Sequence, residues 1–216
     1  MVAEVLAFIA IALVIGGAFV YQWWARNQRM KRLQAWADQH GATYEPIDRS
    51  LADDLPGLTP YGMGSGRKAR HVIRGRHKGR SFIAFQYEYT VSNGKSSTTY
   101  YFRILRVRAP ISGHGLSIQR EHFGHKIADA LGGEDIDFES DAFSKRFWVQ
   151  CKDRRFAYDI ITPEMMEYLM PTRLHWQWSG QTLQVHEKGR IEPRLLDALL
   201  EDVEGFLERL PRHRLA

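Results

Sequence analysis

Residues 81–91, SFIAFQYEYTV, alternate two sets of side chains, and this alternation limits the possible folds more than any other feature. A period of two is typical of a β-strand with one buried face. Asn93 and Gly94 follow, a pair suited to the positive φ angles of a tight turn, and residues 97–108 then resume the strand pattern. The sequence therefore predicts an antiparallel hairpin.

Shorter segments surround this hairpin. Residues 69–76 precede it and predict a third antiparallel strand. Beyond Pro110 we expect a helix that begins after Thr162, a good N-cap, with Pro163 in its first turn, and that ends before Pro171. The other segments predicted there are strands at 115–119, 135–139 and 146–151, a short helix within 125–133, and a last hairpin made of 174–180 and 181–189.

The C-terminal segment repeats large apolar residues at helical spacing from Leu195 to Leu210, and Pro211 follows. Such an amphipathic helix must cover an apolar surface, and the sheet is the obvious partner. Strands followed by a packing helix predict an α+β fold, with a curved antiparallel β-sheet or open barrel packed by the C-terminal amphipathic helix. A pleckstrin-homology-like barrel is a special case of this class.

The N-terminal segment from Val5 to Tyr21 contains no charged or amide side chain. With the next three residues it gives about 20 positions, roughly 30 Å of helix, enough for a bilayer core. A cleaved signal peptide would need a basic start and small residues at its end, whereas this segment starts with Glu4 and ends with aromatic residues. The sequence therefore predicts an uncleaved N-terminal transmembrane helix.

Aromatic and basic residues follow this run, as at the edge of a membrane. The aromatic rings suit the headgroup level, and the excess of cations on this side predicts a single-pass protein of the cell membrane with its N-terminus outside and its C-terminal domain cytoplasmic. The lipid bilayer is then the first expected partner. The residues predicted at the membrane interface are Tyr21, Trp23, Trp24, Arg26, Arg29, Lys31 and Arg32.

Four parts of the chain are expected on these grounds. Residues 1–25 form the transmembrane anchor, and residues 26–41 form a juxtamembrane amphipathic helix. Residues 42–66 are rich in proline and glycine and predict an irregular linker. Residues 67–211 form the cytoplasmic α+β domain.

The formal charge of +5 is unevenly distributed. Without Glu4 and the four cations after Trp24, 26 basic and 24 acidic residues remain. Residues 66–80 hold seven cations and no acid, whereas residues 133–141 hold five acids and no cation. Regular alternation would place Arg70, Val72, Arg74 and Arg76 on one face of a strand.

The basic strand is the main candidate binding site. We expect it to contact anionic lipid headgroups or an acidic protein partner, although a charged edge strand that discourages edge-to-edge pairing is an equal alternative. Nucleic acid is disfavoured as a partner, because the aromatic residues nearby alternate as core positions do and the rest of the domain is net negative. The candidate residues are Arg67, Lys68, Arg70, Arg74, Arg76, Lys78 and Arg80.

Catalytic and metal chemistry have weaker signals. His122 and His125 lie three apart, but zinc needs three or four converging ligands and no HExxH motif is present. Cys151 lies beside cations that could lower its pKa, yet no histidine is near it in the sequence. We therefore predict no catalytic residue, metal site or cofactor.

Residues 137–149, DFESDAFSKRFWV, and 156–169, FAYDIITPEMMEYL, carry the one family resemblance. The chain resembles an uncharacterised family of actinobacterial single-pass membrane proteins. That family has no assigned activity, so the resemblance transfers no functional residue.

The function expected from the sequence is that of a membrane-anchored cytoplasmic binding or scaffold module, seated on the inner leaflet through its basic strand. One alternative is an enzyme with an unrecognised pocket that uses histidines or acids. Another is a structural subunit of a membrane complex. The sequence leaves the oligomeric state open.

Overall fold

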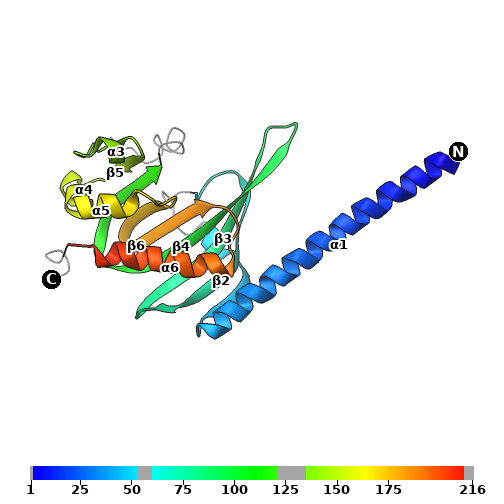
Figure 1. The fold of residues 1–216 in the computed structure, drawn as a ribbon, viewed down its shortest axis with the longest axis horizontal. Coiled ribbons are helices and arrows are strands. Elements are labelled where there is room, and N and C mark those ends of the chain that lie inside the picture. The colour runs from blue at the N-terminus through cyan, green and yellow to red at the C-terminus, as the bar shows by residue number, and fades with distance from the viewer. Residues whose placement is uncertain (1, 53–59, 121–134, 212–216) are drawn as a thin grey trace.

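The computed structural model of the protein describes residues 2–52, 60–120 and 135–211. It contains one long N-terminal helix, an open antiparallel sheet of six strands and C-terminal helices. Helix α1 (Val2–Gln39) leads away from the sheet, and only its last turns lie on it (Figure 1).

The sheet is built around one long strand, β4 (Ser97–Arg120). The strands are hydrogen-bonded in the order β1-β2-β3-β4-β5, and β6 also pairs with β4. Among the described strands, β1 and β6 do not pair with each other, so the sheet stays open and no barrel closes. The other strands are β1 (Thr43–Asp48), β2 (Ser65–His77), β3 (Arg80–Ser92), β5 (Phe147–Gln150) and β6 (His175–Lys188).

The predicted hairpin is present as β3 and β4, which pair in register from Phe82↔Val107 to Ser92↔Ser97. At its turn, Asn93 Oδ1 accepts a hydrogen bond from the Ser96 amide at 2.8 Å, and Gly94 has φ +83°. A left-handed conformation of this kind is what glycine adopts without a steric penalty.

Two predictions identify strand residues correctly but divide the strands wrongly. Residues 115–119 belong to β4, which continues past Pro110 because that proline lies between Arg108 and Gly113, where the register with β6 shifts. Residues 174–189 do not form a hairpin. They hold one strand, β6, which passes through Gly180 at φ +53° and pairs with β4 along its length.

The predicted linker 42–66 is also wrong in part. Residues Thr43–Asp48 form β1, which pairs with β2, and Ser50–Ala52 form the short helix η1. Pro46 is tolerated because β1 is an edge strand, where a missing N–H breaks no ladder on its outer side.

Three short helices follow β4. These are α3 (Asp141–Ser144), α4 (Arg154–Ile160) and α5 (Pro163–Leu169). The predicted cap of α5 is confirmed, since Thr162 Oγ1 accepts from the Met165 amide at 3.3 Å. The predicted strand at 135–139 is absent, and the predicted helix within 125–133 lies outside the described residues.

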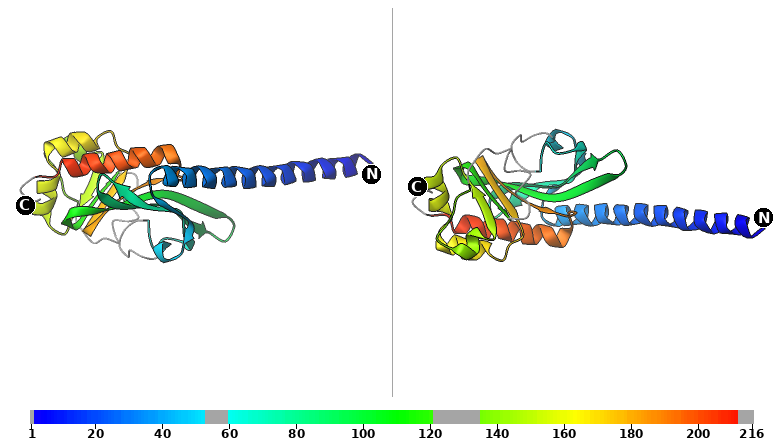
Figure 2. Two further views of the ribbon diagram at one scale, coloured as in Figure 1. Left: turned by 90° about the horizontal axis from the view of Figure 1, so that it is seen from below. Right: turned by 90° about the horizontal axis from the view of Figure 1, so that it is seen from above.

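Helix α6 (Pro193–Glu208) and the end of α1 cover one face of the sheet, here called the helix face, while η1 lies on the opposite face (Figure 2). Trp176 of β6 stacks on Phe206 of α6 with ring centroids 4.6 Å apart. The opposite face holds a separate cluster that includes Leu51, Tyr87 and Phe102. The sheet therefore has a core on both faces.

The last turns of α1 belong to the folded domain. Leu33 and Ala37 are fully buried in the core of the helix face, together with Trp36. The Trp36 indole donates to Asp197 Oδ1 of α6 at 3.0 Å. The domain therefore includes part of residues 26–41, and a boundary at residue 66 is too late in the chain.

The predicted transmembrane helix is not supported. Within residues 2–52, 60–120 and 135–211, no helix combines the length and the apolar character that crossing a bilayer requires. The uncharged segment is one part of α1, which continues without a break through Arg26, Arg29, Lys31 and Arg32 to Gln39. The transmembrane helix and the single-pass location that depended on it are corrected by this finding.

Docking of α1 can be tested by shortening a leucine. Leu33→Ala should lower the free energy of unfolding by about 2–5 kcal/mol, because it opens a cavity in a packed core. The matched control is Leu13→Ala in the same helix, where the side chain is 72% exposed and the change should stay within about 0.5 kcal/mol. Chemical denaturation followed by circular dichroism measures both, and equal effects would contradict the docked arrangement.

Candidate functional site

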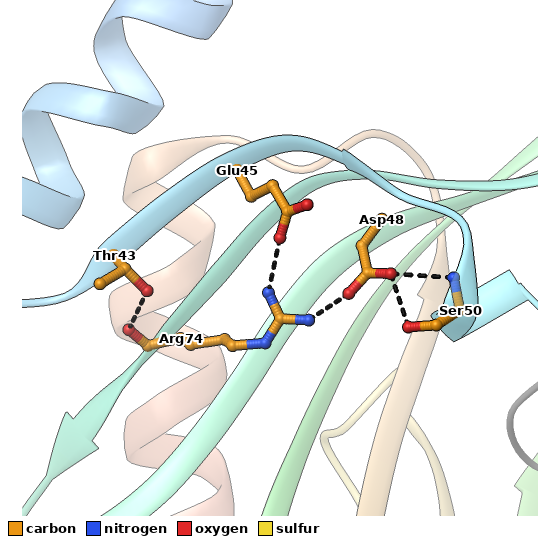
Figure 3. A network of polar contacts seen from close by, with 5 residues as sticks. All are labelled: Thr43, Glu45, Asp48, Ser50 and Arg74. Carbon is orange, nitrogen blue, oxygen red and sulfur yellow. Dashed lines mark hydrogen bonds and ion pairs between the residues drawn. The ribbon is translucent and has the colours of Figure 1, made fainter.

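Arg74, one of the seven cations of the basic strand, is neutralised by β1 (Figure 3). Its Nη1 donates to Glu45 Oε2 at 3.0 Å, and its Nη2 pairs with Asp48. Ser50 donates to Asp48 through its amide and its hydroxyl. These hydrogen bonds and the charge of Arg74 lower the pKa of Asp48. Arg74 therefore ties β2 to the edge strand.

Two more cations of the strand pair with α6. Lys78 Nζ lies 3.0 Å from Glu201 Oε2, and Arg80 Nε lies 3.6 Å from Glu204 Oε1. The hydrogen bond and charge of Glu201 raise the pKa of Lys78. These pairs link the β2–β3 turn to the covering helix and leave less free charge for a partner.

The remaining three cations outside the cavity are Arg67, Arg76 and Lys68. Arg67 Nη1 donates to the Gly64 carbonyl at 3.1 Å, and Arg76 Nη2 donates to the Gly79 carbonyl at 2.9 Å. Lys68 is exposed. The basic strand is thus not one continuous binding surface, and Arg70 alone among its seven cations lines the cavity described next.

A β-bulge changes the direction of the side chains at Arg70. The register of β2 with β3 shifts between Arg70 and Ile73, and His71 has φ +52°, in the left-handed region. The extra residue places Val72 in the core of the opposite face and Ile73 in the core of the helix face. Regular alternation is therefore wrong here, and Arg70 and His71 line the same cavity.

That cavity, here called the arginine groove, lies between α1 and the sheet and has a volume of about 420 Å³. Among the described residues that line it, four are arginines and Glu88 is the one carboxylate. The arginines come from three distant segments: α1, β2 and the residues after β6. The lining residues are Trp23, Arg26, Asn27, Arg29, Met30, Pro46, Arg70, His71, Gln86, Glu88, Tyr101 and Arg190.

Two of the four arginines are held by carboxylates. Arg70 Nε donates to Glu88 Oε1 at 2.8 Å, and Arg29 Nε donates to Glu192 Oε1 at 2.9 Å. Since each contact occupies one of the five N–H donors of a guanidinium, both arginines keep donors for another group.

The other two arginines of the groove are less constrained. Arg190 lies over the ring of Tyr101, with its Cζ 4.4 Å from the ring centroid. Arg26 is exposed and makes no ion pair with any residue that the structure describes. Both guanidinium groups can therefore meet a ligand without first breaking an ion pair.

His71 is a neutral member of the groove. Burial lowers its pKa to about 4, and the charges of Arg29 and Arg70 act in the same direction. Burial also raises the pKa of Tyr44 to about 12, so its hydroxyl keeps its proton. Tyr44 Oη lies 2.8 Å from His71 Nδ1, and we assign the hydroxyl as the donor. The remaining ring proton then lies on Nε2, and His71 is a hydrogen-bond donor without charge.

Gln86 supplies an unsatisfied polar group. Its side chain is 3% exposed, and its Oε1 has no hydrogen-bond partner among the described residues. Buried polar atoms are nearly always paired in folded proteins, so this oxygen can accept a hydrogen bond from a water or a ligand. An amide can turn either its oxygen or its NH₂ group toward that molecule.

The groove combines strong cationic donors with neutral donors. Guanidinium groups match the geometry of carboxylate and phosphate oxygens and bind them through charge-assisted hydrogen bonds. Anions therefore fit this site best.

No group of three or more His, Cys, Asp or Glu side chains that could hold a metal ion is gathered in the part of the chain that the structure describes. His122, His125 and their neighbour Glu121 lie outside the described residues.

The thiol of Cys151 is an unfavourable nucleophile in this structure. Burial raises its pKa, and its Sγ donates to the His114 carbonyl at 3.5 Å. A thiol needs a lowered pKa and access to react at neutral pH.

The residues predicted for a membrane interface fall into two groups: some line the arginine groove and the others lie outside it. Trp23, Arg26 and Arg29 join Arg70 in the arginine groove, and Arg32 lies 3.5 Å from Glu192. The exposed members outside the groove are Tyr21, Trp24, Lys31 and Arg32. The roles assigned to these residues from the sequence stay predictions.

The opposite face contains a second polar cluster, within the core. Gln184 Oε1 accepts from Arg106 Nε and from the Tyr61 hydroxyl, each at 3.1 Å, and Gln184 Nε2 donates to Gln177 at 3.1 Å. These buried hydrogen bonds join Tyr61, Arg106, Gln184 and Gln177 and help to fix the packing of that face. The cluster is a structural feature, because its polar groups bond to one another.

No model of a known protein family matches this chain, and no curated protein is detectably similar to it. The chain is similar to the crystal structure of the mycobacterial trehalose monomycolate transport factor A, TtfA, with a TM-score of 0.57 and 11% sequence identity. The match covers 84% of this chain and 96% of that one. The two proteins share a fold. At this identity the similarity to TtfA shows nothing further.

Buried histidines predict how stability depends on pH. Burial lowers the pKa of His71 and His175 to about 4 and that of His186 well below its usual value. In the unfolded chain each has a pKa of about 6.5, so the unfolded state binds more protons below that pH. Stability should therefore fall as the pH drops from about 6.5 towards 4, by about 1.4 kcal/mol per pH unit for each histidine.

The contribution of His71 is measured with His71→Asn, since asparagine tolerates the left-handed conformation. Urea unfolding across this pH range should give a slope smaller by one proton, about 1.4 kcal/mol per pH unit. An unchanged slope would show that His71 is not buried in the neutral form.

Proposed function

We propose that the protein is a binding module that holds an anionic group of its ligand, a phosphate or carboxylate, in the arginine groove. The observation that carries this proposal is the meeting of four arginines from three segments around about 420 Å³, with Glu88 as the one carboxylate among the described lining residues. Structural ion pairs alone would bring acids to such a cluster in similar number.

The proposal narrows the site expected from the sequence. Five of the seven cations of the basic strand are bonded to acids or carbonyl groups that lie outside the groove, and Lys68 lies outside it as well. Arg70 remains as the contribution of that strand. Arg190, Gln86 and Tyr101 join it from elsewhere in the fold.

Binding should be strongest where the groove is sheltered from water. Gln86 and His71 form its buried part, at 3% and 8% exposed, and they offer neutral polar groups to an anion. Arg26 and Arg190 lie at its exposed rim, where their charges attract the anion. A single carboxylate or phosphate can then contact cations from both walls.

Anion binding supports a binding or scaffold role. An acidic protein partner would supply a carboxylate, and a lipid headgroup would supply a phosphate. The enzyme and the structural subunit stay predictions. The resemblance to an uncharacterised actinobacterial family stays a prediction as well.

The test compares the phosphate affinity of a double variant that lacks two rim charges of the groove with that of a double variant that lacks two charges elsewhere. Inorganic phosphate, titrated by calorimetry at low ionic strength, should bind Arg26→Gln/Arg190→Gln at least tenfold more weakly than the unchanged protein, because each charge-assisted hydrogen bond contributes about 1.5–3 kcal/mol. The control Lys68→Gln/Arg76→Gln changes the net charge equally on residues outside the groove.

The control pair should keep its phosphate affinity within about twofold, since screening weakens distant charges. Equal losses in the two pairs would mean that phosphate responds to net charge alone, and the groove would not be the site.

A further inference from the structure

An exposed apolar face of α1 leads directly into the arginine groove. Trp23 lines the groove, three residues before Arg26. Residues three and four positions earlier in a helix lie on the same face, which places Val20 and Phe19 next to Trp23 and places Leu13 further along. We call this face, from Leu13 to Trp23, the apolar track.

The apolar track is open to solvent. Leu13, Phe19, Val20 and Trp23 are 72%, 69%, 66% and 65% exposed. Gly16 lies between them, and a Cβ added there would meet no atom within 4 Å, so the space above it is open. Ten residues of helix span about 15 Å. Exposed apolar surface that is continuous over such a length marks a binding surface.

We propose that the ligand is an anionic amphiphile, whose headgroup lies in the arginine groove and whose aliphatic chain lies along the apolar track. This inference rests on the proposed function, because it assumes that the groove binds an anion. It adds the chemical class of the rest of the ligand.

Charge and apolar surface together select this occupant. A free phosphate or an acidic peptide would leave the track in water, whereas an aliphatic chain attached to the anion covers it. A second copy packed in parallel on this face would bring the Arg26 and Arg29 charges of both chains together. An amphiphile is complementary to both parts at once.

The probes are short-chain lipids in monomeric form, so that binding does not require a bilayer. Dihexanoyl phosphatidic acid should bind about tenfold more tightly than dibutanoyl phosphatidic acid, since each fully buried methylene increases affinity roughly fourfold and the track buries a chain on one side only. Both should bind more tightly than inorganic phosphate. Dihexanoyl phosphatidylcholine, with no net charge, should bind at least tenfold more weakly than the phosphatidic acid of equal length.

Variants on two sides of α1 test whether the apolar track, rather than any exposed apolar side chain of the helix, contacts the aliphatic chain. Phe19→Gln/Val20→Gln should abolish the effect of chain length and leave inorganic phosphate binding unchanged. The matched control is Val14→Gln/Tyr21→Gln on the opposite side of the helix, where both side chains are also exposed, at 72% and 67%. This control should keep the tenfold difference between the two phosphatidic acids.

Each outcome decides between the two proposals. Phosphate binding without an effect of chain length, or an equal loss in both variant pairs, overturns the amphiphile and leaves the anion site in place. A dimer in sedimentation that Phe19→Gln/Val20→Gln dissociates also overturns it, since a second copy then covers the track. If neither phosphate nor phosphatidic acid binds, the proposed function itself fails.

Discussion

The packing of the last turns of α1 against the sheet is the contact on which the rest of the structure depends. Leu33, Trp36 and Ala37 enter the core of the helix face, and the Trp36 indole bonds to α6. Glu192, just before α6, pairs with Arg29 at 2.9 Å and with Arg32 at 3.5 Å. Because α1 is one wall of the arginine groove, this contact holds both Arg29 and the groove in place.

The second requirement is the bulge at His71. A regular strand would send Arg70 and His71 to opposite faces, and the groove would lose its buried donor. A left-handed φ costs free energy in a residue other than glycine, and such strain tends to persist at functional sites where the surroundings enforce it. Here Tyr44 holds the ring of His71 at 2.8 Å, and His71 is 8% exposed. The strained residue thus lies at the polar end of the groove.

Local patterns could be predicted from the sequence, whereas contacts between distant segments could not. The β3–β4 hairpin follows from alternation and an Asn-Gly turn, and the start of α5 follows from the hydroxyl of Thr162. No local signal shows that Arg190 would meet Arg70, since 120 positions, with four strands and three helices among the described residues, separate them. Counting cations in residues 66–80 could not reveal their acidic partners on β1 and α6.

Hydrogen exchange of the two walls of the groove, with and without saturating inorganic phosphate, tests the central claim most directly. The amides of residues 27–39 should exchange more slowly than those of residues 11–20 in the same helix, because only the former pack on the sheet. Phosphate should slow exchange at residues 26–30 and 70–72 together. Uniform exchange along α1, unaffected by phosphate, would contradict both the docked helix and the site that it forms.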